Sequence, residues 1–169
     1  MALTLNNLTG FETGGLEEAE STSGSPSVQS TIVRTGDYAL ALVPGDNYAW
    51  SVLGAGSDAG QKRIVSFHVR FSDVTPTAGT YFFRAVNSLG ASIVAFALYL
   101  DTDGDLMFEP NSGATTTVTN PFTVDTMHRI DILWEEANPG TFDLWLDGSS
   151  IISLTGQDLT PLGSVLVYN

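Results

Sequence analysis

Asp101, Asp103 and Asp105 are the residues whose spacing most closely suggests metal chemistry. They alternate in the stretch Asp-Thr-Asp-Gly-Asp, which begins like an oxygen-rich calcium loop. A loop of the EF-hand type would close with a glutamate further along the chain, but the residue at that position is Ser112. The same residues also suit a tight turn, because Asp and Gly adopt the backbone angles that turns require. The sequence therefore predicts a turn here, with a Ca²⁺ site as the alternative and no other cofactor.

Trp145 is the side chain best suited to contact a sugar. Its neighbours Leu144 and Leu146 should face the protein interior, which turns the indole outward. An exposed indole stacks on the C–H surface of a sugar, and the carboxylates of Asp143 and Asp147 could accept hydroxyl protons. An outward Trp can equally be covered by a neighbouring loop or by a second subunit. The sequence therefore leaves two predictions for Trp145: contact with a glycan, or cover by a loop or a second subunit.

No arrangement of residues in the sequence identifies a catalytic reaction. Glu135 and Glu136 are adjacent, so they would point to opposite faces of a strand, whereas a glycoside hydrolase needs two carboxylates that flank one bond. His68 and His128 lie on different expected strands without Cys or carboxylates at the spacing of zinc ligands, and we expect them at the surface or rim. The chain is therefore expected not to be an enzyme.

The elements that must position these residues are strands, because apolar side chains recur with a period of two. Ile130, Ile132 and Trp134 share one face and are expected in the core, and Asp147 with Gly148 suits a tight hairpin. Residues 16–26 are acidic and Ser-rich and are expected to form a surface loop. The segments expected to form strands are 3–8, 28–33, 38–42, 48–53, 62–71, 80–86, 93–100, 106–109, 115–122, 129–134, 142–147 and 165–168.

About eleven or twelve short strands without helical periodicity predict an all-β fold. The expected architecture is a two-sheet antiparallel β-sandwich or jelly roll, with a closed barrel as the competing possibility. A chain of 169 residues fits one domain, 1–169. It contains no Cys, so burial and backbone pairing must provide its stability.

The strong negative charge of the chain argues against two classes of partner. Six Lys and Arg against 19 Asp and Glu give a formal charge of −13, which opposes binding to nucleic acid and to anionic membranes. The sequence has no apolar stretch long enough for a membrane-spanning helix and no secretory leader, so we expect folding in a cytoplasm and no membrane insertion.

Three motifs carry a resemblance to a known family. They are GFETG at 10–14, RTGDYALAL at 34–42, and HRIDILW at 128–134 followed by GTFDLWLDG at 140–148. In this order they resemble the concanavalin A-like lectin and glucanase superfamily, near its laminin-G-like branch. The resemblance implies a jelly roll with a further strand after 165–168, beside the N-terminal strand. Three alternatives explain that strand: it comes from another subunit, it is absent and an edge of the sheet stays open, or it belongs to a natural protein that is longer than this sequence. The paired glutamates of β-glucan-cleaving members, in the pattern E-x-D-x-x-E, have no counterpart here.

These observations lead to three functional hypotheses. The first is a noncatalytic bacteriophage virion module, a capsid decoration or tail-associated protein, made in the host cytoplasm and displayed on the virion surface. It would be a homo-oligomer such as a trimer, bound to other virion subunits and able to contact cell-surface carbohydrate. The alternative is an extracellular carbohydrate-binding lectin module, and a glycoside hydrolase comes third.

Overall fold

The computed structural model describes residues 21–34, 39–41, 47–51, 60, 62–86, 94–159 and 165–168, and these residues form strands and connections without a helix. None of them therefore belongs to a helix capable of crossing a membrane. The strands in this part of the chain are β1 (Ser21–Ser23), β2 (Ser27–Gln29), β3 (Ala39–Ala41), β4 (Asn47–Ser51), β5 (Lys62–Arg70), β6 (Thr80–Val86), β7 (Val94–Leu100), β8 (Leu106–Pro110), β9 (Thr116–Val118), β10 (Met127–Glu135), β11 (Gly140–Leu146), β12 (Ser149–Gln157) and β13 (Val165–Tyr168).

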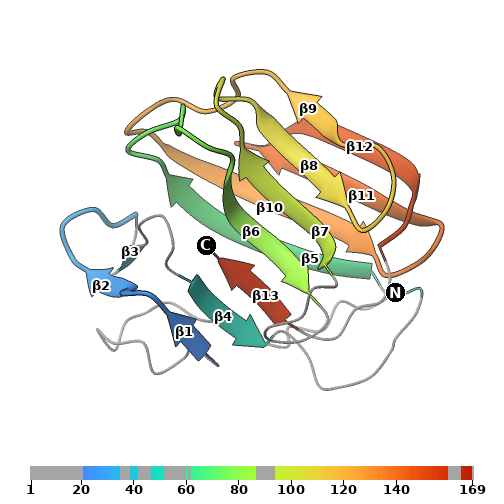
Figure 1. Ribbon diagram of the computed structural model, residues 1–169, viewed down its shortest axis with the longest axis horizontal. Coiled ribbons are helices and arrows are strands. Elements are labelled where there is room, and N and C mark those ends of the chain that lie inside the picture. The colour runs from blue at the N-terminus through green and yellow to red at the C-terminus, as the bar shows by residue number, and fades with distance from the viewer. Residues whose placement is uncertain are drawn as a thin grey trace.

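The strands form two antiparallel sheets that face each other (Figure 1). The seven-stranded sheet has the order β1-β4-β13-β6-β7-β8-β9, the four-stranded sheet has the order β12-β11-β10-β5, and β2 pairs with β3 separately. Although β13 comes last in the sequence, it lies inside its sheet, between β4 and β6. This arrangement confirms the predicted all-β, two-sheet antiparallel jelly-roll sandwich.

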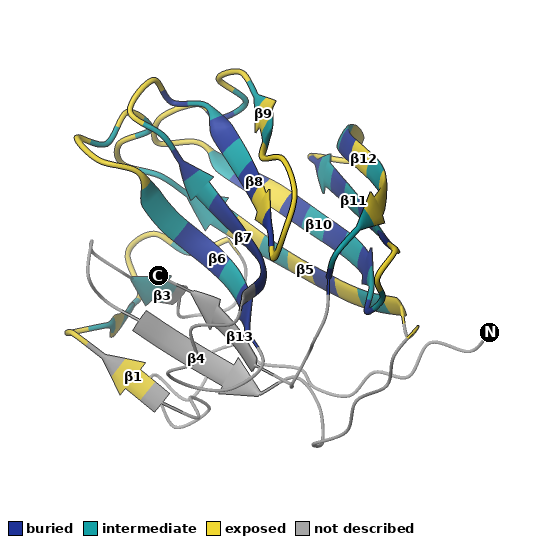
Figure 2. Cartoon of the chain, turned by 45° about the vertical axis from the view of Figure 1, so that its right-hand side comes forward, coloured by how far each residue is buried: buried dark blue, intermediate teal, exposed yellow. Residues whose placement is uncertain are grey.

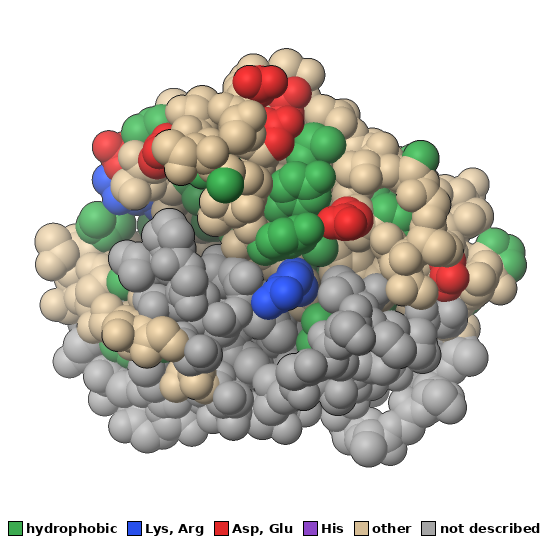
Figure 3. Space-filling model, in the orientation of Figure 1, with side chains coloured by type: hydrophobic (Ala, Val, Ile, Leu, Met, Phe, Trp, Pro, Cys, Tyr) green, Lys and Arg blue, Asp and Glu red, His purple; other side chains and the backbone are tan. Residues whose placement is uncertain are grey.

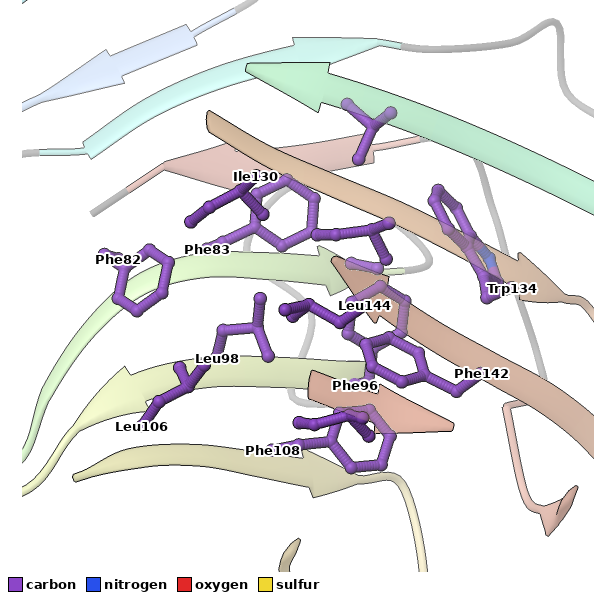
Figure 4. Packing of buried hydrophobic residues seen from close by; sticks show 14 of the residues in the cluster. Phe82, Phe83, Phe96, Leu98, Leu106, Phe108, Ile130, Trp134, Phe142 and Leu144 are labelled. Carbon is purple, nitrogen blue, oxygen red and sulfur yellow. The ribbon is translucent and has the colours of Figure 1, made fainter. Parts of the chain in front are cut away.

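The core lies between the two sheets, and it is filled by the inward-facing side chains at alternate positions of the strands. Along β10 and β11, buried residues alternate with half-buried or exposed ones (Figure 2). Phe142 of β11 meets Phe96 of β7 with ring centroids 5.0 Å apart and Phe108 of β8 at 4.0 Å (Figure 4). Trp134 is 3% exposed and packs edge-on against Phe96, which confirms its expected place in the core. Each large side chain buried in this way contributes about 1.5 to 3 kcal/mol of hydrophobic stabilisation.

The hairpin after β11 has the predicted geometry. Asp147 and Gly148 have φ angles of 51° and 83°, the pair of positive values that a tight two-residue hairpin needs. The strand that follows, β12, continues to Gln157 and pairs along the length of β11. The hairpin therefore forms one edge of the four-stranded sheet.

Several expected boundaries were wrong, and the local reasons differ. A short polar segment can pair at a sheet edge without an apolar face. Residues 16–26 were expected to be a loop, but Ser21–Ser23 forms β1 and pairs with β4. The expected strand 28–33 ends early, since the Gln29 side-chain oxygen accepts the backbone N–H groups of Thr31 and Ile32, each at 2.7 Å. Such local bonds compete with strand pairing.

The expected strand 115–122 is likewise shorter than predicted, because pairing with β8 is confined to Thr116–Val118. Asn120 then takes a positive φ of 43°, a backbone angle that a strand does not use. The expected strand 3–8, motif 10–14 and the remainder of loop 16–26 before Ser21 lie outside the described residues.

Candidate functional site

The aspartates of the calcium hypothesis lie in the turn between β7 and β8, as the sequence predicts for a turn. Asp101 Oδ1 accepts the backbone N–H groups of Asp103 at 3.0 Å and Asp105 at 2.9 Å, and Asp105 Oδ1 accepts that of Asn120 at 3.0 Å. Within the described ranges, no three His, Cys, Asp or Glu side chains are grouped so that they could hold a metal ion. Backbone amides are therefore the observed partners of Asp101 and Asp105, and calcium binding stays a prediction.

The three residues proposed for glycan contact all come from β11 and its hairpin. Trp145 and Asp143 lie half-buried on the outer face of the four-stranded sheet, as predicted, and Asp143 Oδ1 accepts the Ser153 hydroxyl at 2.6 Å. Asp147 instead closes the hairpin onto β10. Its Oδ1 accepts the Arg129 backbone N–H at 2.8 Å, and its Oδ2 lies 2.7 Å from His128 Nδ1. The backbone bond first, and then the bond to His128, lower the pKa of the Asp147 carboxyl.

The histidines differ from each other. His68 is exposed, as expected, and its partial burial, followed by the charges of Arg34 and Arg129, lowers its pKa. The expected surface or rim position of His128 was wrong, because this residue is 7% exposed. It precedes Ile130 in the inward-facing series of β10, and its ring is satisfied because Nε2 accepts the Thr123 backbone N–H at 3.1 Å.

The adjacent glutamates have separate partners. Glu136 is buried and forms a two-point ion pair with Arg63, with Nε to Oε1 at 2.9 Å and Nη2 to Oε2 at 3.1 Å. Glu135 accepts the Thr141 hydroxyl at 3.4 Å. This geometry provides ion pairing and strand contacts rather than two carboxylates facing one bond.

A different group of aromatic and charged side chains lies on the outer face of the seven-stranded sheet. The register pairs Tyr81 with Tyr99 and Tyr99 with Met107, and in the next row it pairs Arg84 with Ala97 and Ala97 with Glu109. Their strand neighbours Phe83, Leu98 and Phe108 point into the core. We call the outward group the tyrosine face; its members are Tyr81, Arg84, Tyr99, Met107 and Glu109.

Contacts within the tyrosine face hold its side chains in place. The rings of Tyr81 and Tyr99 lie 5.0 Å apart at 50°, and the Tyr81 hydroxyl donates to Glu109 Oε2 at 3.0 Å. The Arg84 guanidinium lies 5.8 Å from the centroid of the Tyr81 ring, within the range of a cation–π contact. Figure 3 shows hydrophobic side chains gathered over β6 to β8, with a basic side chain at one end and acidic side chains alongside and beyond.

The electrostatic surroundings keep both tyrosines protonated. Partial burial, and then the hydrogen bond to Glu109, raises the pKa of Tyr81. Partial burial, followed by the charges of Glu109 and Asp101, raises the pKa of Tyr99. Both hydroxyls therefore act as hydrogen-bond donors or acceptors rather than as bases. Two aromatic rings with polar groups at their rim suit a ligand that has both C–H surfaces and hydroxyls.

Sequence reasoning missed the tyrosine face because a bulge in β6 changes the phase of the strand. Tyr81 and Arg84 are three residues apart, so a regular strand would place them on opposite faces. The pairing with β7 shifts between Tyr81 and Phe83, which leaves Phe82 as the extra residue and returns Arg84 to the face of Tyr81. Glu109 joins them through the pairing of β8 with β7; the predicted turn at 101–105 brings these strands together, but the local sequence does not specify the register that places Glu109 opposite Ala97.

Comparison with known proteins shows the fold but no family. No family model matches the sequence, and no curated protein matches it. A solved endo-β-1,4-glucuronan lyase from the fungus Trichoderma reesei is similar, with a TM-score of 0.61 and 19% identity over 92% of this chain and 80% of that chain. The globular domain of T. cruzi calreticulin has a TM-score of 0.64 and 12% identity over 92% and 78% of the two chains.

The carbohydrate recognition domain of Emp46p is also similar, with a TM-score of 0.55 and 11% identity over 96% of this chain and 84% of that chain. At these identities the likeness concerns the backbone arrangement alone. It confirms the predicted fold, an all-β jelly-roll sandwich of two antiparallel sheets.

Proposed function

We propose that the chain is a noncatalytic carbohydrate-binding module and that the tyrosine face is its glycan site. The observation that carries the proposal is the pairing of two outward tyrosine rings, with Arg84 and Glu109 at their rim, across three adjacent strands. The rings provide apolar surface, Arg84 provides donors and Glu109 provides acceptors. All of these groups stand on paired strands, which position side chains more firmly than loops do.

The dimensions of the face suit a short stretch of glycan. Two strand spacings separate Arg84 on β6 from Glu109 on β8, which corresponds to roughly 10 Å. Between them lies Ala97, which is 3% exposed and so lies beneath the larger side chains around it, while Tyr81 and Tyr99 in the next row are half-buried. A sugar unit could therefore stack on a ring while its hydroxyls reach one charged group or the other.

The fold offers additional support by analogy. One protein with this backbone arrangement is a carbohydrate recognition domain, and another is a lyase that acts on glucuronan. The fold therefore accommodates glycans, although the site must be argued from this chain's own residues.

A glycan array followed by calorimetric titration of the best ligand tests the proposal. Tyr81→Ala and Tyr99→Ala should each weaken binding by about 1 to 2 kcal/mol, roughly five- to thirtyfold, because each removes a stacking surface. Trp145→Ala is the matched control, since it removes an aromatic ring from the opposite sheet. Absence of binding to any glycan would end the proposal. Binding lost only in the Trp145 variant would move the site to the face predicted from the sequence.

A structural subunit of a virus particle is the second candidate function, and it requires a surface for self-association. The outer face of the four-stranded sheet has the required character, because Ile64, Leu133 and Trp145 lie across adjacent strands and Ile64 is 55% exposed. Beside them Arg129 pairs with Asp131 at 2.9 Å, so these charges cancel locally in a strongly acidic chain. This ion pair therefore adds little to the repulsion between two copies of an acidic chain.

Light scattering and mass spectrometry test this second candidate. We expect an oligomer that Leu133→Lys converts to a monomer, and peptides of the chain in purified particles. A monomeric wild type that is also absent from particles would exclude the subunit function and leave the glycan proposal untouched.

A further inference from the structure

We infer that the tyrosine face prefers glycans with free amino groups, and that the ligand's ammonium group binds beside Tyr99 and Glu109, on the side of Tyr81 away from Arg84. The inference rests on the proposed function, because it names the class of glycan that the same site would bind. It extends that function from general sugar recognition to charge-selective recognition.

The first step is the separation of charges within the face. Arg84 and Glu109 occupy the two outer strands of the three, in one row with Ala97 between them. Tyr81 contacts both charges, since the guanidinium lies 5.8 Å from its ring centroid and its hydroxyl donates to Glu109 Oε2. The Tyr81 side chain therefore spans the interval between the positive and the negative end of the site.

The second step concerns the surroundings of Tyr99. Glu109 is a diagonal neighbour of Tyr99 on this face, because its partner across the β7–β8 pairing is Ala97, two residues from Tyr99. Burial, followed by the charges of Glu109 and Asp101, raises the pKa of the Tyr99 hydroxyl. Its ring lies beside that of Tyr81 on the β7 side of the face. The acidic groups thus act on the part of the aromatic surface formed by Tyr99.

The third step is the match to an ammonium group. An ammonium carries three N–H donors, binds a carboxylate through charge-assisted hydrogen bonds, and is attracted to the face of a tyrosine ring. An N-acetyl group at the same sugar position lacks the positive charge and so loses the charge-dependent part of these interactions. The formal charge of −13 also draws a cationic oligosaccharide toward the protein and repels a uronate. The expected order of affinity is amino sugar, then neutral sugar, then uronic acid.

Chitin-derived oligosaccharides of one length, either fully N-acetylated or fully deacetylated, provide the test. Calorimetric titration at about pH 6, where the amines are largely protonated, should show the deacetylated form binding about tenfold more tightly. Glu109→Gln should abolish this preference, because the amide keeps an oxygen that accepts the Tyr81 hydroxyl but lacks the negative charge that attracts the ammonium group. Its affinity for the deacetylated form should therefore fall much more than its affinity for the acetylated form. Higher salt should reduce the preference.

Asp143→Asn is the matched control. It removes the same charge from the outer face of the opposite sheet, and it should retain the preference. An equal loss in the Asp143 and Glu109 variants would mean general attraction between a polyanion and a polycation, and would overturn the inference. Equal affinity of the wild type for both oligosaccharides would also overturn it, while leaving the glycan proposal intact if the tyrosine variants still lose binding. Failure to bind any glycan would overturn the proposed function itself.

Discussion

At the scale of single residues, one carboxylate ties two strands and a buried ring together. Asp147 accepts the backbone N–H of Arg129, faces His128 Nδ1, and stands at the first position of the hairpin. Because His128 Nε2 accepts the Thr123 N–H, the ring proton lies on Nδ1 and is donated to Asp147. Asp147 therefore links β10 to the hairpin, and its predicted contact with a sugar stays a prediction.

This link predicts a pH-dependent loss of stability in Asp147→Asn. The folded-state pKa of the Asp147 carboxyl lies below its unfolded value. Its contribution is therefore fully present above the unfolded pKa of about 3.9 and is lost as the pH falls through the folded value. Since the side chain is half exposed, we expect a cost of about 1 kcal/mol at neutral pH that disappears in strong acid.

Thermal unfolding followed by circular dichroism across this pH range checks the prediction. Asn tolerates the positive φ of 51°, so the substitution adds little backbone strain. Asp143→Asn serves as the control, because its carboxylate accepts the Ser153 hydroxyl on the outer face of β11, away from the hairpin turn. A destabilisation of the Asp147 variant that stays constant down to acid pH would show that the carboxylate charge is not what stabilises the hairpin.

At the scale of elements, the sequence pattern was informative where a strand has one buried face. The expected segment 80–86 coincides with β6, and 62–71 with β5 to within one residue. The pattern could not reveal the bulge between Tyr81 and Phe83, since Phe82 and Phe83 are both apolar and both buried. Nor could it reveal β13 between β4 and β6, because pairing between strands far apart in sequence has no local signature. The candidate site depends on the bulge, and so it lay beyond prediction.

The two turns at Gly104 and Gly148 allow a comparison of backbone strain with steric contact. Their φ angles are similar, 88° and 83°. A Cβ at Gly104 would lie 2.7 Å from Asn120 Oδ1 and 3.1 Å from the Val74 carbonyl oxygen, whereas one at Gly148 would meet nothing within 4 Å. Gly148→Ala should therefore cost about 1 kcal/mol from backbone strain alone. Gly104→Ala should cost about 2 to 3 kcal/mol, since contact adds to strain.

Urea denaturation of both variants measures these costs. The difference between them is the part that depends on packing around the turn between β7 and β8. Equal costs for the two substitutions would mean that Asn120 and the backbone at Val74 move aside without penalty, and that this turn does not hold the loop after β5 in place.

At the scale of the whole molecule, the core keeps two chemically different faces apart. One face carries the tyrosines and their charged rim, and the other carries Trp145 beside an ion pair. Phe142 joins the layers, because β11 presents it inward while presenting Asp143 outward, and it contacts Phe96 and Phe108 of the opposite sheet. The strands beneath the proposed glycan site therefore pack directly on the four-stranded sheet.

Phe142→Ala should consequently lower the free energy of unfolding by about 3 to 5 kcal/mol, the range for large core aromatic residues that leave a cavity. A domain of ordinary stability has only about 5 to 15 kcal/mol, so the variant should unfold at much lower urea concentration with an unchanged slope. Phe142→Leu keeps much of the side-chain volume and should cost considerably less.

A loss below about 1 kcal/mol in the alanine variant would contradict the role of Phe142 in filling the space between the sheets. Removing a fully buried ring with two aromatic neighbours from a close-packed interior leaves a cavity, which must lower the free energy of unfolding by more than that. For the molecules that remain folded, the free energy of glycan binding should decrease by less than the free energy of unfolding, since Tyr81 and Tyr99 stand on the far side of their sheet from the cavity.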